Sequence, residues 1–235
     1  MTATSPRPSR ATETALKILA LDLHWTWNHE ADLLWQSINP DLWEKTRNPW
    51  ITLTRTPKSD LAAALSDPDT KALIKASMAR RKYELERRTW FTQKYPESSL
   101  SEVAYFSMEF MLSEALPIYS GGLGNVAADQ LKAASDLGVP VVAVGLLYAQ
   151  GYFRQEITPE GTQKALYPFN DPAHLPIQPV LTPDGEWFRL SVQTATGEIW
   201  LRAWKAVIGR ATLYLLDTND PSNPPAIRCI TTQLY

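Results

Sequence analysis

Three glycines, Gly121, Gly122 and Gly124, stand within four positions of a chain that has only ten glycines in 235 residues. They lie in the stretch IYSGGLGNVAADQLKAASDLG, residues 118–138, where an amphipathic helix pattern follows them. The first turn of a helix has unpaired backbone N–H groups and the positive end of the helix dipole. Anions, above all phosphate, bind at such a position. The glycines therefore predict either a phosphate-binding turn or a tight strand-to-helix turn without a ligand.

Glycine suits both interpretations, because it adopts backbone conformations that a Cβ forbids and lets a ligand approach the main chain closely. One class of phosphate loop is excluded. The lysine and the hydroxyl residue of a nucleoside-triphosphate loop are absent after Gly124.

The other reactive or charged residues predict little chemistry. The formal net charge of −2 provides no basic field for nucleic acid. The stretch ARRKYELERR, residues 79–88, interleaves Glu84 and Glu86 with its basic residues, as a solvated helix face does. The single cysteine, Cys229, excludes an internal disulfide, and we interpret it as a buried bystander rather than a catalytic thiol. No metal site is predicted.

Nine tryptophans are many for this length, and six of them lie in the amino-terminal part, at Trp25, Trp27, Trp35, Trp43, Trp50 and Trp90. Aromatic clusters favour a core, where tryptophan is largely buried. The alternative is a surface on which a sugar stacks, because a pyranose presents an apolar face to an aromatic ring.

The elements around the glycines form a recognisable unit. VAYFSMEF, residues 103–110, is an extended apolar run, and VPVVAVGLLYA, residues 139–149, is typical of a strand buried on both faces. Between them, residues 123–137 have a helix pattern that ends at Gly138. Strand, glycine turn, helix and strand predict a βαβ unit with a right-handed crossover in a parallel sheet.

The flanking regions differ from this unit. Residues 13–95 predict helices: one region over 13–37 with Asn28 as an internal cap, short helices that begin at Asn39-Pro40 and near Ser59, and a long helix from Asp67 to about Gln93. After Gly151, period-two patterns over residues 185–193, 197–208 and 210–217 predict antiparallel strands inserted beside the parallel sheet.

The two ends of the chain carry separate expectations. Residues 1–12 are polar and proline-bearing, which predicts a flexible tail. The apolar stretch over 15–25 is interrupted by Lys17 and Asp22, so we predict neither a signal peptide nor a membrane span and expect a cytoplasmic protein. The chain ends on IRCITTQLY with one clear βαβ unit, from which we expect a truncated domain.

Residues 105–155 carry a resemblance to a known family. The stretch SMEF, the turn GGLG and the segment GLLYAQGYFRQ occur in the order and spacing of short bacterial α-glucan phosphorylases. Residues 23–50 resemble the amino-terminal helical extension of these enzymes, and ALYPFNDP and the segment 214–235 also fit. The resemblance covers most of residues 16–235.

The resemblance implies an α/β fold, the amino-terminal Rossmann-like half of a GT-B glycosyltransferase. Its divisions would be a flexible tail over 1–12, a helical extension over 13–98 and an incomplete Rossmann-like domain over 99–235. The implied reaction is phosphorolysis of α-1,4-glucan by inorganic phosphate, which releases glucose 1-phosphate with retention. Pyridoxal 5'-phosphate would be bound by a lysine of the missing carboxy-terminal domain, beyond Tyr235. The resemblance is compatible with a homo-oligomer, whereas nucleic acid and membranes are not expected as partners.

The resemblance also implies site residues. Gly122, Leu123 and Gly124 match the turn that faces the substrate phosphate and sugar, and Glu109 matches an acidic residue near the cofactor phosphate and the substrate. The alternative for Glu109 is a structural carboxylate paired with an arginine. No catalytic residue is assigned in this chain, and Lys132 matches no cofactor position.

Three positions depart from the pattern of relatives: Met111 replaces an aromatic residue, Ser113 a histidine and Asn125 an arginine. These departures affect side-chain contacts and leave backbone contacts unchanged.

Two other hypotheses remain. A nucleotide-sugar glucan synthase shares the architecture, but it commonly has lysine two residues before the GGLG turn and aspartate after it, where this chain has Tyr119-Ser120 before and Asn125 after. A non-catalytic glucan-binding fragment would use the tryptophan-rich helices instead.

Overall fold

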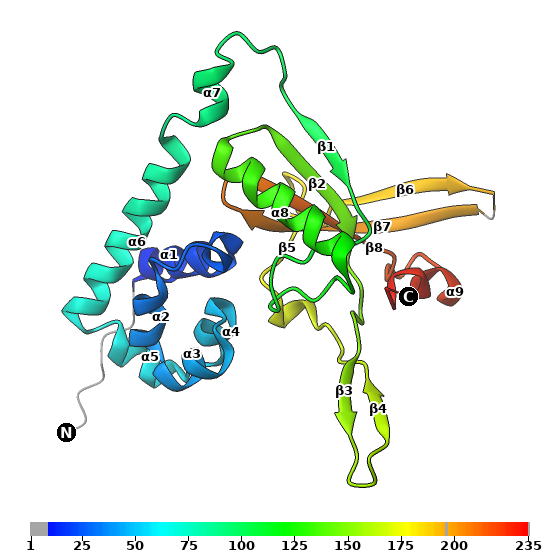
Figure 1. Cartoon of the computed structure of the whole chain (residues 1–235), viewed down its shortest axis with the longest axis horizontal. Coiled ribbons are helices and arrows are strands. Elements are labelled where there is room, and N and C mark those ends of the chain that lie inside the picture. The colour runs from blue at the N-terminus through cyan, green and yellow to red at the C-terminus, as the bar shows by residue number, and fades with distance from the viewer. Residues whose placement is uncertain (1–8, 196, 235) are drawn as a thin grey trace.

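The computed structural model describes residues 9–195 and 197–234. Most of the predicted tail, residues 1–8, lies outside the described residues. Figure 1 shows a helical part beside a part built on a twisted sheet. Helix α1 (Arg10–Leu21) begins within the predicted tail, because the Ser9 side chain accepts a hydrogen bond from the Thr12 amide and caps the helix.

The helical part consists of short elements: α1, the 3-10 helix η1 (Leu23–Thr26), α2 (Asp32–Ile38), α3 (Pro40–Thr46), α4 (Pro49–Arg55), α5 (Lys58–Ala64), α6 (Pro68–Glu86) and α7 (Trp90–Lys94). The predicted asparagine-proline start is confirmed, because the Asn39 side chain accepts from the Leu42 amide. Asn48 caps α4 in the same way, with Pro49 at the first helical position.

Two predicted helices are broken in the structure. Asp22 ends α1 and caps η1 with its side chain, so residues 13–37 form three elements, and α2 begins at Asp32 rather than at Asn28. The predicted helix from Asp67 to about Gln93 ends at Glu86. A second helix starts after Thr89, which forms a reciprocal capping box with Thr92. Short polar side chains that bond to nearby amides explain both breaks.

The tryptophan prediction is correct for part of the set. Trp35 and Trp43 are 1% and 3% exposed and lie in a hydrophobic cluster with residues of α1, α2 and α6. Trp90 is 47% exposed and packs edge-to-face against Tyr95, so it is not a core residue.

The second part is an α/β unit on a mixed sheet. Strands β1 (Val103–Phe106), β2 (Val141–Leu146) and β8 (Ala211–Asp217) are parallel neighbours in that order. Strands β7 (Gly197–Ile208), β6 (Arg189–Thr194) and β5 (Gln178–Pro179) continue the sheet in antiparallel pairing. The predicted βαβ unit is confirmed as β1, α8 (Gly122–Leu137) and β2.

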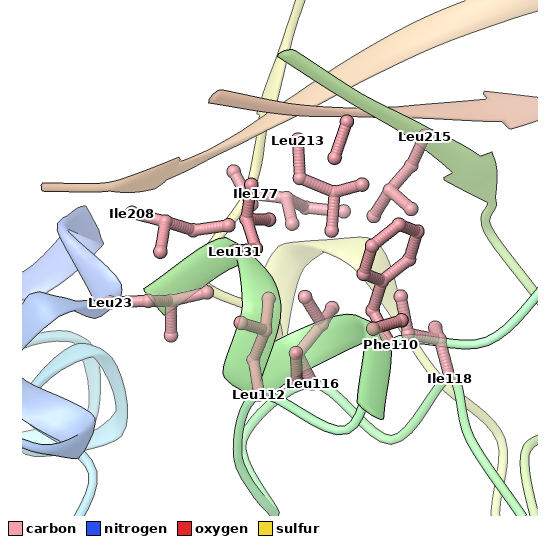
Figure 2. Packing of buried hydrophobic residues seen from close by; sticks show 14 of the residues in the cluster. Leu23, Phe110, Leu112, Leu116, Ile118, Leu131, Ile177, Ile208, Leu213 and Leu215 are labelled. Carbon is pink, nitrogen blue, oxygen red and sulfur yellow. The ribbon is translucent and has the colours of Figure 1, made fainter. Parts of the chain in front are cut away.

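Helix α8 covers one face of this sheet. Figure 2 shows Leu131 of α8 pointing into the same core as Leu213 and Leu215 of β8, and all three are fully buried. Leu23 of η1 joins this core, so the helical part and the sheet share packing. Gly138 ends α8 at φ +71°, and a Cβ there would lie 2.2 Å from Thr89 Oγ1.

Two strand predictions need correction. Residues 210–217 were expected among the inserted antiparallel strands, but β8 pairs parallel with β2 and so extends the parallel sheet. Strand β2 was expected to be buried on both faces, yet only Ala143 and Gly145 are buried within it. Among the described residues, α8 provides cover on one face, which explains the alternation.

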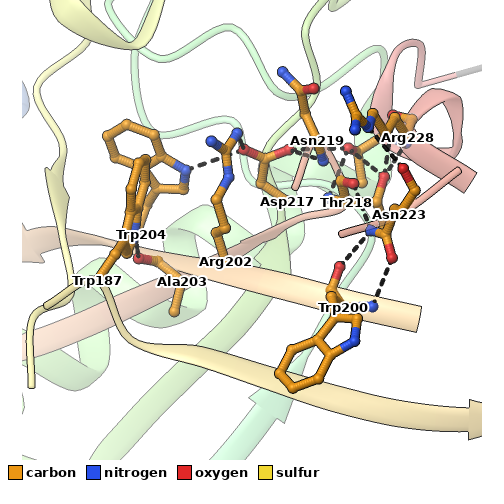
Figure 3. A network of polar contacts seen from close by, with 11 residues as sticks. Trp187, Trp200, Arg202, Ala203, Trp204, Asp217, Thr218, Asn219, Asn223 and Arg228 are labelled. Carbon is orange, nitrogen blue, oxygen red and sulfur yellow. Dashed lines mark hydrogen bonds and ion pairs between the residues drawn. The ribbon is translucent and has the colours of Figure 1, made fainter. Parts of the chain in front are cut away.

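Two further elements leave the sheet. Strands β3 (Arg154–Ile157) and β4 (Gln163–Leu166) form a hairpin that projects from the body in Figure 1. At the carboxyl end of β8, a polar network anchors the short helix α9 (Pro225–Arg228), as Figure 3 shows. Its centre is Asn223, 2% exposed, whose amide nitrogen donates to the carbonyl groups of Trp200 and Thr218.

Candidate functional site

The carboxyl ends of the parallel strands meet at one edge of the sheet, where ligands bind in open α/β folds. A groove of about 280 Å³ lies there, lined by Phe106, Ser107, Met108, Val144, Gly145, Leu146 and Leu216. Phe106 and Met108 are 72% and 59% exposed on its rim. The chain then continues from the groove through Glu109 toward the glycine turn.

Glu109 is 2% exposed and lies beneath the glycine turn. Its Oε2 atom accepts hydrogen bonds from the amides of Ser120 at 2.8 Å and Gly121 at 3.2 Å, and its Oε1 atom accepts from the Ser120 hydroxyl at 3.4 Å. Hydrogen bonds from amides to a carboxylate are stronger than bonds between neutral groups. Glu109 therefore fixes the backbone that leads into α8.

Of the three glycines, Gly124 serves close packing, and none of them serves an unusual backbone angle. Gly121 is extended, and none of the three glycines of the turn has a positive φ. A Cβ on Gly124 would lie 2.9 Å from Tyr119 Cβ and 3.2 Å from the Met111 nitrogen, so this position has no room for a side chain. A Cβ on Gly121 or Gly122 would meet nothing within 4 Å.

The first amides of α8 are accessible. Gly122 and Leu123 are exposed, and no hydrogen bond within the described part of the chain uses their N–H groups. The Gly124 amide, in contrast, donates to the Gly121 carbonyl at 3.1 Å. Helix α8 has no side-chain cap, so the two free amides and the positive end of the helix dipole face solvent. This arrangement suits an anion.

Tyr119 packs beside the turn and remains protonated at neutral pH. Burial and the carboxylate of Glu114, to which its hydroxyl donates at 3.1 Å, raise the pKa of Tyr119 to about 12. Tyr119 therefore contributes a packing surface and a neutral hydroxyl at this site.

The structure brings most of the predicted site residues together. Glu109 Oε2 lies 3.3 Å from the position of a Cβ on Gly124, and the Met111 amide donates to the Gly124 carbonyl at 2.9 Å. Gly122, Leu123 and Asn125 lie on the exposed side of the same turn. Cys229 lies elsewhere and is exposed, so its prediction as a buried bystander is wrong.

Sequence reasoning missed Ser120 and Ser107. Ser120 donates both its amide and its hydroxyl to Glu109, and Ser107 Oγ donates to the Glu109 carbonyl at 2.9 Å. The available signal was an acidic residue in an apolar run with a serine two positions before it, because hydroxyl groups satisfy buried carboxylates and backbone groups. Nothing in the sequence pattern indicated Ser120. Over residues 9–195 and 197–234, no group of three potential ligands could bind a metal, and no helix has the length and apolar character to cross a membrane.

A family model described as "Protein of unknown function (DUF3417)" matches residues 12–116. Three curated relatives match nearly the whole chain. A protein named maltodextrin phosphorylase from Thermococcus litoralis is 40% identical over 218 residues, 92% of this chain and 26% of the relative. A protein named glycogen phosphorylase from Mycobacterium tuberculosis is 36% identical, over 94% of this chain and 26% of the relative. Another protein of that name, from Aquifex aeolicus, is 37% identical, over 92% of this chain and 31% of the relative.

These matches confirm the resemblance to α-glucan phosphorylases over almost all of the chain. The chain spans about a quarter to a third of the length of these relatives, 26% to 31%. The matched region includes both the helical part and the glycine turn of α8.

Proposed function

We propose that this sequence is part of an α-glucan phosphorylase, which transfers a glucosyl unit from α-1,4-glucan to inorganic phosphate with retention. The similarity to proteins of that name supports the reaction class. The observation that carries the proposal for this chain is the pair of free amides at the start of α8, on a turn fixed from below by Glu109.

The chain would form one wall of a cleft in a GT-B fold, and a second domain of the longer protein would form the other. Substrate phosphate would approach the amides of Gly122 and Leu123, which donate to an anion without a conformational change. A donor of this kind typically contributes about 2.7–4 kcal/mol to a charged transition state. In this arrangement Glu109 is a positioning residue, because its carboxylate contacts the turn.

Pyridoxal 5'-phosphate is the cofactor that we propose for the longer protein, bound there by a lysine outside this chain. When bound, its phosphate group supplies a proton donor beside the attacking phosphate. The exposed amides of this chain fit a phosphate at the cleft wall, because they offer donors without a protein acceptor. Phosphate, α-1,4-glucan and the second domain are the proposed partners, and the cytoplasm is the proposed location.

The test uses the protein encoded by the complete reading frame. Incubated with maltodextrin in phosphate buffer, it should release glucose 1-phosphate. A parallel reaction with a nucleotide-glucose donor and no phosphate tests glucan synthesis. Release of nucleotide in the second reaction, with none of glucose 1-phosphate in the first, would favour the synthase and overturn the proposal.

A further inference from the structure

The outer edge of strand β3 is a strand edge without a neighbour among the described residues. Strand β3 pairs with β4 on its other side, and the hairpin that they form projects from the body in Figure 1. A two-stranded ribbon is only marginally stable in water, and further strands stabilise it. The unpaired N–H and C=O groups of such an edge are a template for pairing with another chain.

The hydrogen bonds of the hairpin show which residues of β3 face outward. The Thr158 amide donates to the Thr162 carbonyl at 2.9 Å, so these two residues form a hydrogen-bonded pair. Hydrogen-bonded and non-hydrogen-bonded pairs alternate along an antiparallel ladder. The backbone groups of Arg154 and Glu156 therefore bond to β4, whereas those of Gln155 point away from it. Within the described residues, no hydrogen bond beyond this ladder uses the backbone of Gln155.

The charged side chains of β3 are complementary to a second copy of the same strand. Arg154 and Glu156 are exposed on either side of Gln155, and neither forms an ion pair within the described residues. If two copies of β3 pair antiparallel about a twofold axis at Gln155, Arg154 of each copy lies opposite Glu156 of the other. These are non-hydrogen-bonded positions, where side chains are closest and opposite charges stabilise the pair.

The same charges exclude the neighbouring alignments. An axis shifted by one residue would place Arg154 opposite Arg154, or Glu156 opposite Glu156, and like charges directly opposite each other are destabilising. The outer edge of β4 lacks this complementarity, because an axis at Ala165 would place Lys164 opposite Leu166. The charge pattern therefore favours β3 over β4 and Gln155 over its neighbours as the position of the axis.

The other face of the hairpin is apolar where the two copies would meet. The ring of Phe153 lies 6.2 Å from that of Tyr167 between centroids, which places Phe153 on the face opposite Arg154 and Glu156. The axis at Gln155 brings Phe153 of each copy opposite Ile157 of the other. Ile157 is 61% exposed, so the pairing would cover an apolar side chain that is otherwise in water.

We propose that two copies of the protein associate through the outer edges of β3 and join their hairpins into one antiparallel sheet. A second copy is the partner that these observations favour, because it carries the same charges in the reverse order. The contact is small, so the association is weak and depends on protein concentration, and the hairpin is free in dilute solution. The proposal does not rest on the phosphorylase reaction, because none of these residues lines the groove or belongs to the glycine turn.

The first test traps the pair with a disulfide in the protein encoded by the complete reading frame. Gln155→Cys, combined with Cys229→Ser to remove the exposed native thiol, places two thiols at the axis. Hydrogen-bonded antiparallel residues lie about 5.5 Å apart between Cα atoms, within the roughly 4.4–6.8 Å that a disulfide spans. Mild oxidation should give a covalent dimer on non-reducing electrophoresis. Ala165→Cys in the same background is the control and should give none, because Ala165 lies on the neighbouring strand, away from the axis.

The second test reverses the charges beside the axis. Arg154→Glu or Glu156→Arg, each added to the Gln155→Cys protein, creates like-charge contacts across the axis and should lower the cross-linked fraction about tenfold. A mixture of the two variants should regain cross-linking, because every contact in the mixed pair again joins opposite charges. Thermal melts establish that each variant is folded.

Three results would overturn the proposal. The first is equal cross-linking of Gln155→Cys and Ala165→Cys, including none in either, which would mean that a second copy does not occupy the edge of β3. The second is stronger cross-linking of Ala165→Cys, which would place the contact on β4. The third is a mixture of the two charge variants that cross-links no better than either variant alone, which would show that Arg154 and Glu156 do not pair between copies.

Discussion

At the residue scale, the Glu109 carboxylate determines the shape of the turn before α8. In Glu109→Gln, one oxygen still accepts a hydrogen bond but the charge is lost. We expect the free energy of unfolding to fall by about 1–3 kcal/mol, because bonds to a charged acceptor are replaced by weaker neutral ones. Urea denaturation measures this, with Glu102→Gln as the control, since Glu102 is exposed and lies outside the turn. Equal stability of both variants would mean that Glu109 does not support the turn.

Substitutions at Gly124 and Gly122 test two different roles of the turn, close packing and access for a ligand. Gly124→Ala should lose about 1–3 kcal/mol of stability, because its Cβ would lie 2.9 Å from Tyr119 Cβ. Gly122→Ala should melt at or above the native temperature, because its Cβ meets nothing and alanine favours a helix. In the complete protein, Gly122→Ala should still slow phosphorolysis, since its methyl group lies beside the proposed phosphate position. A native rate for Gly122→Ala would argue against phosphate at this turn.

The sequence located these residues but misidentified why glycine is needed. The cluster at Gly121, Gly122 and Gly124 predicted a turn before a helix, and α8 begins there. The expectation of unusual backbone conformations fails at Gly124, where the constraint is a neighbouring chain segment at Tyr119 and Met111. Such contacts depend on how the segment after β1 folds back, and local sequence patterns do not contain that information.

At the element scale, charged side chains connect α6 to its surroundings, although the sequence pattern of residues 79–88 predicted a solvated helix face. Glu84 is buried enough to oppose ionisation, but the hydrogen bond from Arg87 and the charges of Arg87, Arg80 and Arg210 outweigh burial and lower the pKa of Glu84. A carboxyl group whose pKa is lowered on folding stabilises the folded state at pH values above its ordinary pKa of 4.5. This stabilisation is lost as the pH falls below 4.5 and the group becomes protonated in the folded protein.

We therefore expect the melting temperature of the chain to fall as pH decreases from 5 to 3, partly through Glu84. The Glu84→Gln variant should be less stable than the native chain at pH 7, and the difference should shrink toward pH 3. Melting curves across that range measure both. A difference that stays constant with pH would show that the charge of Glu84 does not stabilise the fold.

Element types were more predictable than element boundaries. The Asn39-Pro40 pair located the start of α3, since proline fixes the first helical residue and asparagine caps it. Helix α4 begins in the same way at Asn48-Pro49 but was not among the predicted helices. The break at Thr89 could not be predicted from periodicity. The capping box of Thr89 and Thr92 starts a new helix there, and the Thr89 side chain also packs closely against Gly138 at the end of α8. The position of β8 between β2 and β7 likewise depends on contacts between residues that are far apart in the sequence.

At the scale of the whole molecule, Asp22 connects the helical part to the sheet. It is 4% exposed, and its carboxylate accepts from the Gly209 amide at 2.8 Å and from Arg81 Nε at 2.8 Å. Gly209 lies between β7 and β8, whereas Arg81 lies on α6. One side chain thus joins three regions that are far apart in sequence.

Asp22→Asn replaces an acceptor by an amide group whose nitrogen cannot accept from either partner. We expect a loss of about 2–3 kcal/mol, below the roughly 3–5 for a fully buried pair, because the Arg81 side chain is 26% exposed. Urea denaturation followed separately by tryptophan fluorescence and by circular dichroism measures it, and the exposed Asp129→Asn is the control. If Asp22→Asn were as stable as the native chain, the Asp22 carboxylate would not stabilise the connection between the helical part and the sheet.

The projecting hairpin of β3 and β4 should open locally and be accessible to proteases while the rest of the described structure stays folded. Of the described strands, β3 and β4 pair only with each other, and all eight of their residues are exposed. Their amides should therefore exchange with deuterated water long before those of β2 and β8, because a two-stranded ribbon opens without global unfolding. A protease that cuts near Gly161 separates β2 from β8 in sequence but not in space. The nicked protein should migrate as one species in gel filtration and as two bands under denaturing electrophoresis.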